Sequence, residues 1–434
     1  LLGLPISLLL KLENSRRSVM STQTQPKPDG SNFTLVSLTV GHFLQHWLVN
    51  ALLVLLPTVV ASLGGGLAFY SILQFIRYIS GGLITCLAGF IVDRPGNRWG
   101  VILTGCMILG AILFILLAVT PVAGFLIIIA ILLPIPGQVW HIPAIAAISQ
   151  QYSSNRGFGL TVHGVGAQVG ALVGPIVTGA IPIALGLWLG MELWRAISVI
   201  YIIPILITAV LVWIALKNLK SVVTATPDNN GLGYHLNNAK GLLSNPVILA
   251  LIAIVFLRQT GFNALEAWVP YYLTADETEG GFGANALSQG IGLGIVTSLG
   301  FFMAPILGFL SDRIGRKPIL VPSMVIVGIL TFTVMYMTSI VLLLVILGVI
   351  GLFSYTLGQL LQALVLDQVD TGIEGTTMGL VLGINQLLGS FSPLIAIWVS
   401  QTWGLSGVFG FASILWVAPA IILLLTPVKK ANSN

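Results

Sequence analysis

The sequence predicts an all-α membrane protein that crosses the bilayer with twelve helices, arranged as two pseudo-symmetric halves of six. Three observations predict this fold class. Of the 434 residues, 56% are hydrophobic and only 7% are charged, and the mean hydropathy is +1.01, which is more apolar surface than a soluble core can bury. The apolar residues form long continuous runs rather than the alternating pattern of a β-barrel. A short charged phrase from the first half also recurs in the second half.

Twelve windows are long enough for a spanning helix, which needs about 20 mostly apolar residues. They lie near 35–62, 67–92, 99–120, 122–148, 158–189, 194–216, 246–273, 286–311, 317–338, 340–366, 375–400 and 405–427. We therefore expect an N-terminal six-helix bundle over 35–217, a cytoplasmic linker over 218–245, a C-terminal bundle over 246–427 and a tail over 428–434. Residues 1–34 are expected to be a disordered tail, with Met20 as the natural start.

The basic residues predict how the chain is oriented. Arg77 and Arg258 lie inside predicted spans and Arg195 lies near the opposite side, whereas all the other Lys and Arg residues fall in the tails and in loops on one side. The positive-inside rule then places both termini in the cytoplasm. The net charge of +5 is this bias restated, so we expect no nucleic-acid partner. Cys86 and Cys106 both lie in predicted spans, which favours neither a disulfide framework nor a metal cluster.

Polar landmarks shared by the two halves indicate that a six-helix unit was duplicated. Asn50-Ala51-Leu52 followed by Pro57 matches Asn263-Ala264-Leu265 followed by Pro270. Gly137-Gln138 matches Gly358-Gln359, and Pro175 matches Pro393. Paired six-helix halves predict a substrate site at their interface near the membrane midplane, with the halves rocking about it.

The recurring phrase carries a family resemblance. GFIVDRPGNR at 89–98 and GFLSDRIGRK at 308–317 resemble the loop signature of the major facilitator superfamily, which follows its second and eighth helices. The resemblance implies the major facilitator fold, a small-molecule substrate, the lipid bilayer as surroundings and a monomer. We expect a cytoplasmic gate in which the glycines allow close helix approach or a turn with positive φ, and the arginines pair across the two halves. Its residues are Gly89, Asp93, Arg94, Gly96, Arg98, Gly308, Asp312, Arg313, Gly315 and Arg316.

The fifth predicted helix contains regularly spaced small residues. Its sequence GVGAQVGALVGPIVTG places Gly166, Gly170 and Gly174 four residues apart, followed by Pro175 and Gly179. Small residues at this spacing allow tight packing, here expected across the seam between the halves. The pattern is similar to the antiporter motif of drug-exporting members of the superfamily. Ordinary glycine-mediated packing is the alternative interpretation.

Polar side chains recur at helical spacing within the predicted spans. Charge near the bilayer centre costs roughly 2.5–3.5 kcal/mol on insertion scales, so such residues are functional candidates. Together they predict a lined cavity, although each amide alone could equally be a hydrogen bond between helices. The expected cavity residues are His42, His46, Asn50, Gln74, Arg77, Gln138, His141, Arg258, Asn263, Gln359, Gln362, Asn385 and Gln386.

Proton coupling is expected to involve Glu266, which is the only carboxylate deep in a predicted span. His42, His46 and His141 are alternative proton carriers because histidine titrates near neutrality. His42 and His46 could also hold a metal at their spacing, but no Cys, Asp or Glu shares their face of the helix. We therefore expect no metal site.

A longer stretch resembles one branch of the superfamily. VWHIPAIAAISQQYSSNRGFGLTVHGVGAQVGALVGP is similar to the fosmidomycin-resistance group of exporters, which carries His-Pro near the end of helix 4 and a glycine-rich helix 5. This chain departs from that group by reading His141-Ile142-Pro143.

The function expected from these features is proton-coupled export of a small organic compound by antiport, across a bacterial inner membrane and without a cofactor. Two arginines against one deep glutamate favour an anionic compound. The alternative is a proton-symporting uptake carrier for a nutrient anion, with the same fold and cavity. No hydrolase or zinc-protease motif and no phosphate-binding loop is present, which weighs against an enzyme or an ATP-driven pump. A receptor or scaffold role would leave the buried charges unexplained.

Overall fold

The computed structural model describes residues 32–92, 98–152, 156–185, 192–218, 240–369 and 374–428, and twelve helical spans in these ranges are long and apolar enough to cross a membrane. All twelve predicted spans are confirmed, with small differences at their ends. The N-terminal tail, expected to end at residue 34, ends before Asn32, where the first helix begins. The rest of that tail with Met20, most of the linker (219–239) and the C-terminal residues 429–434 lie outside the described residues.

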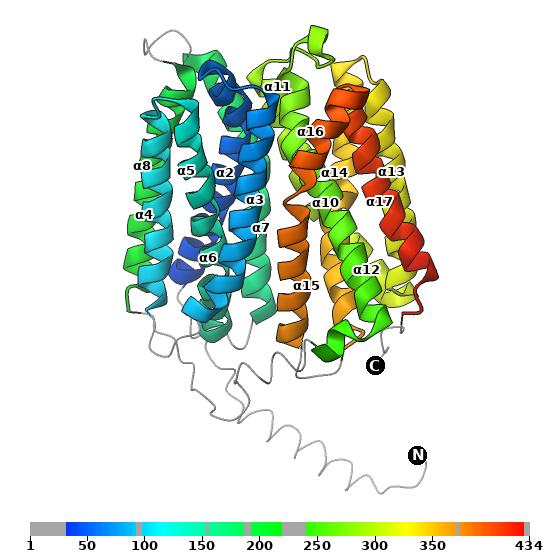
Figure 1. The fold of residues 1–434 in the computed structure, drawn as a ribbon. Helices are drawn as coiled ribbons and strands as arrows, with labels where there is room; N and C mark the ends of the chain where they lie inside the picture. Colours follow the sequence, from blue (N-terminus) through cyan, green and yellow to red (C-terminus); the bar gives the residue numbers. More distant parts are fainter. Residues whose placement is uncertain are drawn as a thin grey trace, which may run out of the picture.

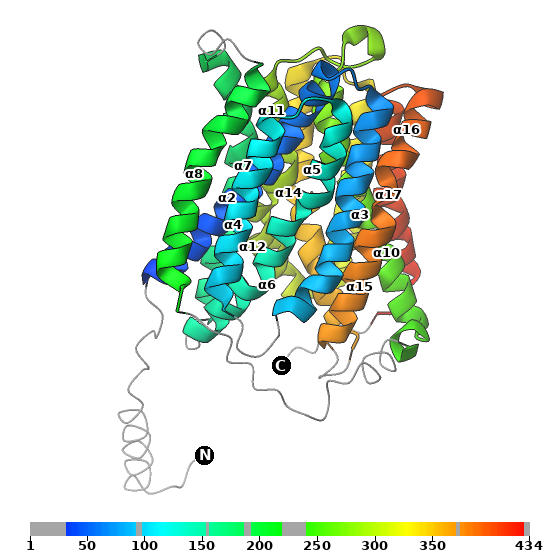
Figure 2. The same ribbon diagram turned by 60° about the vertical axis from the view of Figure 1, so that its left-hand side comes forward.

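The spans follow one another as a bundle of long, nearly parallel helices (Figures 1 and 2). The first six are α2 (Asn32–Ser62), α3 (Leu67–Val92), α4 (Trp99–Ala118), α5 (Leu126–Leu132) with α6 (Pro134–Gln151), α7 (Arg156–Leu185) and α8 (Leu193–Leu216). The second six are α10 (Pro246–Thr274), α11 (Ala286–Ser298) with α12 (Gly300–Ile314), α13 (Arg316–Thr333), α14 (Ile340–Leu366), α15 (Glu374–Gly389) with α16 (Ser392–Trp403), and α17 (Gly407–Leu425). The start of α2 and the end of α17 lie at the same, lower end in Figure 1.

Two large apolar cores hold the bundle together. One is built from residues between Leu35 and Leu216, and the other from residues between Leu242 and Leu423. A small third cluster of Leu53, Val54 and Leu293 lies between them. Outward-facing apolar side chains such as Ile108 and Ile112 on α4 stay exposed, as expected for a surface in contact with lipid.

Three spans are interrupted near their middles. The fourth is broken at Leu133, immediately before Pro134, and the eleventh before Pro393, while the eighth breaks at Leu299. Proline has no backbone N–H, so Pro134 leaves the carbonyl of Ala130 without its helical donor. The Ser80 hydroxyl of α3 lies 3.5 Å from that carbonyl, but it donates at 2.7 Å to the Ile76 carbonyl of its own helix. Irregular backbone at membrane depth is tolerated where it lines a cavity, as Leu133 and Pro134 do.

The glycines of α7 are explained by close helix packing. A Cβ on Gly166, Gly170 or Gly174 would collide with Thr39, Phe43 or Trp47 of α2, which belongs to the same half. The expectation that this series lies on the seam between the halves is therefore wrong for these three. Gly179 does lie there, because its Cβ would meet Ala286 and Leu287 of α11. Pro175 lies beside Gly290 of α11, so α7 is packed between α2 and α11.

This packing predicts a destabilising effect for Gly170→Ala. The added methyl would overlap the backbone carbonyl of Phe43, which cannot rotate away, and overpacking of this kind costs about 1–3 kcal/mol. The measurement is the thermal unfolding midpoint in detergent. Gly164→Ala on the same helix is the matched control, because its Cβ would meet no atom within 4 Å. Equal midpoints for the two variants would contradict the close approach of α7 and α2.

Candidate functional site

A polar cavity of about 420 Å³ lies between the two halves. This volume suits a small organic molecule. Five spans contribute side chains, three from the first half of the chain and two from the second. The lining residues are Gln45, His46, Val49, Asn50, Arg77, Tyr78, Gly81, Thr85, Leu133, Pro134, Gly137, Gln138, His141, Gln259, Phe262, Asn263, Glu266, Leu382, Asn385 and Gln386. The interrupted fourth span supplies the five lining residues between Leu133 and His141, so the break in that helix opens onto the cavity.

Among the residues that the structure describes, one ion pair crosses the cavity between the halves. Arg77 of α3 donates from Nη2 to Oε2 of Glu266 on α10 at 2.9 Å, and the two side chains are only 10% and 17% exposed. The Tyr78 hydroxyl donates to the same carboxylate oxygen at 2.6 Å. Charge-assisted hydrogen bonds in such a poorly solvated place are strong. The contact therefore joins the two halves through the only charged groups that line the cavity.

The arginine is held in position from behind by a hydrogen-bonded series. Its Nε donates to Oε1 of Gln74 at 2.8 Å, and the Gln74 amide donates to the Tyr70 hydroxyl at 2.9 Å. Tyr70 in turn donates to the backbone carbonyl of Ala267 on α10. All four groups of this series follow the α3–α10 boundary, so the orientation of Arg77 depends on how these two helices meet.

Neutral amides supply the remaining polar surface. Thr85 donates to Gln138 at 2.9 Å, Asn50 donates to the His46 carbonyl at 2.9 Å, and Gln259 donates to Asn263 at 2.9 Å. Asn50 Oδ1 and Asn385 Oδ1 are buried without a hydrogen-bond partner among the described residues. Buried polar atoms without partners are rare, and in a binding cavity they are available to a ligand.

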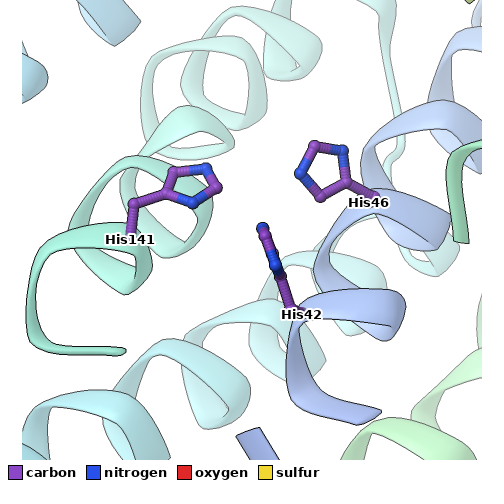
Figure 3. A group of neighbouring side chains, drawn as sticks. All are labelled: His42, His46 and His141. Carbon is purple, nitrogen blue, oxygen red and sulfur yellow. The ribbon is translucent and has the colours of Figure 1, made fainter. Parts of the chain in front are cut away.

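Three histidines gather at the α2–α6 side of the cavity (Figure 3). His42 and His46 lie one turn apart on α2, and His141 comes from α6. The ring centroid of His42 is 4.9 Å from each of the other two, and those two are 5.9 Å apart. His46 and His141 line the cavity, whereas His42 is buried behind them.

The structure does not place five of the predicted residues on the cavity lining. Gln74 and His42 lie directly behind it, in contact with Arg77 and with the other histidines. Gln359 is exposed and donates to the Tyr355 hydroxyl, and Gln362 of α14 also lies away from the lining residues. Helix α14 packs against α11, α12 and α13, and also contacts α10 and α15, but none of its residues is on the cavity lining.

Arg258 is the largest departure from expectation. It is buried under α14, where it donates to the Ser354 carbonyl and to the Gln259 side chain, between the rings of Phe262 and Trp416. No ion pair in the described ranges includes it. A carbonyl, an amide and two aromatic faces thus contact the guanidinium, while its Nε is buried without a hydrogen-bond partner among the described residues.

The loop signatures are only partly described. Asp93, Arg94 and Gly96 lie outside the described residues, as does the side-chain environment of Gly89, while Arg98 is exposed at the start of α4. In the second copy Gly315 has φ +99°, which confirms the predicted turn, but a Cβ on Gly308 would meet nothing within 4 Å. Gly308 thus makes no close approach.

The arginines of the second copy pair within their own half. Arg316 binds Asp312 one turn earlier and, at 3.3 Å, Asp367 at the end of α14, and Arg313 covers the Phe309 ring. The expected pairing of these arginines across the halves is therefore absent from the described residues. Residues 316 and 367 instead join α13 to α14.

The expected site omitted four polar residues that line the cavity, and one of them, Gln259, lies one turn before Asn263 on α10. Tyr78 shares a face with Arg77, but nothing in the sequence indicated that it donates to Glu266. Gln45 and Thr85 line the cavity without belonging to a polar series. Thr85 could have been found as the residue one turn beyond Gly81 on the same face of the helix.

Known proteins resemble this chain in sequence pattern and in fold. The model of the Major Facilitator Superfamily matches residues 38–300 and 278–434. A bacterial homolog to the human lysosomal transporter Spinster, inward-facing and unoccupied, superposes with a TM-score of 0.64 at 16% identity, covering 92% of this chain and 96% of that chain. The nucleoside transporter NupG superposes with a TM-score of 0.68 at 15% identity, covering 91% and 99%. At these identities the likeness shows the fold alone. No curated protein matches the sequence.

The cavity geometry predicts strong coupling between Arg77 and Glu266. Removing one partner of a buried pair leaves an uncompensated charge, so Arg77→Met and Glu266→Met should each lower the free energy of unfolding by about 3–5 kcal/mol. The double variant should recover about 1–3 kcal/mol of the summed loss. The measurement is a double-mutant cycle of unfolding in mixed micelles.

The matched control is a cycle on Arg195 and Glu192, an ion pair at 2.8 Å whose glutamate is 46% exposed. Exposed pairs contribute about 0–1 kcal/mol, so this cycle should show little coupling. Equal coupling in both cycles would mean that the cavity pair is an ordinary solvated contact.

Proposed function

The chain belongs to the major facilitator superfamily, and we propose that within it the protein is a proton-coupled carrier that moves a small organic anion together with a proton. The observation that supports this proposal is the direct bond between Arg77 and Glu266 inside the cavity. Of the described residues on the lining, Arg77 is the one arginine or lysine and Glu266 the one carboxylate, and the two neutralise each other.

The direction of coupling follows from competition for the arginine. While Glu266 is ionised, an anionic solute must displace its carboxylate from Arg77. Protonation of Glu266 removes that competitor and leaves a net positive charge in the cavity. Proton binding and anion binding therefore favour each other, and this reciprocity is required by linkage. A carrier that holds both together moves them in the same direction, which is the symport alternative of the sequence analysis.

The pair also joins the halves that must move. Glu266 belongs to α10 and Arg77 to α3, so the contact must lengthen or break whenever the two halves rock about the cavity. When a proton and an anion are bound together, the ion pair is no longer needed. The anion then binds Arg77, and the proton neutralises the Glu266 carboxylate. An empty cavity with an ionised glutamate keeps the halves joined, which opposes an uncoupled leak.

The seven amides on the lining favour a solute with several hydrogen-bonding groups besides its anionic one. They are Gln45, Asn50, Gln138, Gln259, Asn263, Asn385 and Gln386. A binding site built from hydrogen-bond partners rejects an analogue that lacks the matching groups, because its own buried groups would then be unpaired. We propose a hydroxylated or amidated monoanion rather than an apolar drug.

Export by proton antiport is the second candidate. It is favoured by the α7 sequence from Gly166 to Gly179, which is similar to the motif of drug-exporting members, and by the fosmidomycin-resistance resemblance. The packing of Gly166, Gly170 and Gly174 on α2 gives those glycines a structural role, which weakens this support. The two functions differ in the sign of the pH gradient that drives the solute.

The remaining features of the proposal come from the sequence. The carrier works as a monomer in a bacterial inner membrane, with both termini in the cytoplasm. The proton gradient is its energy source and it needs no resident cofactor. His42, His46 and His141 are the alternative proton carriers, and the experiment below separates them from Glu266.

The proposal predicts different transport defects for Glu266→Gln and Arg77→Gln. Proteoliposomes are loaded with a panel of small carboxylates, phosphonates and sulfonates, and solute movement is followed under pH gradients of either sign. Glu266→Gln imitates the protonated carboxyl group, so it should exchange solute across the membrane but no longer accumulate it. Arg77→Gln should do neither, since it lacks the cation that binds the anion.

The control is Glu192→Gln, which removes an exposed carboxylate far from the cavity lining and should transport like the unmodified chain. Antiport would be favoured if solute accumulated on the side from which protons leave, so that solute and proton cross in opposite directions. Unchanged accumulation by Glu266→Gln, with loss in His46→Gln, would assign coupling to the histidines instead.

A further inference from the structure

The cluster of His42, His46 and His141 has the arrangement of a metal site. The sequence expectation of no metal rested on the α2 series, which offers only two imidazoles. Helix α6 brings in the third, so one nitrogen from each of the three rings lies within 4.8 Å of the others. Figure 3 shows the three rings converging on one space from α2 and α6.

Close packing of the two helices brings these rings together. Gly41 and Trp140 directly precede His42 and His141 in the chain, and the Trp140 indole lies where a side chain at Gly41 would be. Trp140 is completely buried. Absence of a side chain at position 41 thus allows α6 to approach α2, and that approach places His141 against the two histidines of α2.

The tautomer of His42 suits a metal ligand. Its Nδ1 donates to the backbone carbonyl of His163 at 3.0 Å, and a carbonyl oxygen can only accept, so Nδ1 carries the hydrogen. The lone pair of the neutral ring is then on Nε2. That atom is buried and has no hydrogen-bond partner among the described residues. Metal-bound histidines characteristically donate their second N–H to a carbonyl or carboxylate in this way.

The ring of His163 supports this orientation from the opposite side. It stacks on His42 with centroids 4.1 Å apart and planes 19° apart. The His42 ring is therefore fixed both by a hydrogen bond and by a stacked neighbour. In tetrahedral coordination, three nitrogens that each lie about 2.0–2.1 Å from the ion are about 3.4 Å from one another. To bind the ion, the three nitrogens must move roughly one ångström closer to one another. Rotation of the His46 and His141 side chains at the cavity surface can supply this movement.

The geometry points to a binding site for a divalent first-row transition metal of the Zn²⁺ type, held by His42, His46 and His141 with an open coordination position facing the cavity. Imidazole nitrogen suits zinc, cobalt, nickel and copper rather than calcium or magnesium. Three protein nitrogens leave one tetrahedral position free, and the cavity lies on the side of His46 and His141.

The open position has a consequence for the proposed anion carrier, on which this step rests. The three neutral ligands leave the charge of the ion uncompensated. An anionic group in the cavity would complete both the coordination and the charge. The bound metal would then offer the solute a second positive centre besides Arg77.

Cobalt binding tests the site directly. Full-length protein in detergent, freed of metal with a chelator, is titrated with Co²⁺ while visible absorption is recorded. We expect one equivalent to give the intense bands of a tetrahedral ion, and added Zn²⁺ to remove them. His42→Gln, His46→Gln and His141→Gln should each weaken binding at least about tenfold.

Two controls keep the assignment falsifiable. His235→Gln removes the fifth histidine of the chain, which lies in the linker, and should leave the titration unchanged. Elution profile and helical circular dichroism of each variant identify a loss of binding that is caused by misfolding. Binding that survives in folded His46→Gln and His141→Gln, or a spectrum with no tetrahedral bands, would overturn the site.

Azide then tests the open position without any transported solute. If the fourth position is free and faces the cavity, azide should shift the Co²⁺ bands of the unmodified protein and of Arg77→Gln. Cobalt bands that azide does not change would show a closed coordination shell and would overturn that part of the inference. Neither the cobalt titration nor the azide shift depends on pH-driven transport. Failure of the metal site can therefore be distinguished from failure of the proposed function.

Discussion

The ion pair between Arg77 and Glu266 is the interaction on which the rest of the cavity depends. It places two opposite charges at the boundary between two helices that belong to different halves. The Arg77 side chain is 10% exposed and the Glu266 side chain 17%. An isolated charge at this depth would be costly, whereas the pair is neutral and its hydrogen bonds are satisfied by Tyr78 and Gln74. The proposed coupling to one proton rests on the neutrality of this pair and on its position between the two halves.

The surrounding packing keeps this pair in place without sealing it. Helix α7 packs closely on α2 and α11 because glycines remove the side chains that would separate them, and the small apolar cluster of Leu53, Val54 and Leu293 lies between the two cores. By contrast, the fourth span is interrupted at Leu133, beside a cavity that amides from three other helices and Gln138 of α6 line. Tight apolar contacts thus surround a polar space whose groups can exchange partners.

The sequence predicted the fold well because membrane helices are strongly constrained. Backbone groups in lipid must be paired within their own segment, so continuous apolar runs such as 340–366 identify helices directly. The sequence also identified Arg77, Asn263 and Gln138 as cavity residues and Glu266 as a deep carboxylate, because polar side chains in such runs need a polar space. It could not place Arg258 under α14 or Gln359 on an exposed face of α14, since both depend on which helices become neighbours. Nor could it join His141 to the α2 histidines, because that contact depends on Trp140 lying against Gly41.

The most direct measurement of the central claim is proton exchange with solvent when an anion binds. Purified protein in weak buffer with a pH indicator is mixed with an anion from the transport panel, and the proton count per bound anion is recorded. If the anion displaces Glu266 from Arg77, the unmodified protein should take up a proton on binding and Glu266→Gln should take up none. Proton release on binding, or equal uptake by Glu266→Gln, would contradict the claim that this pair couples the two ligands.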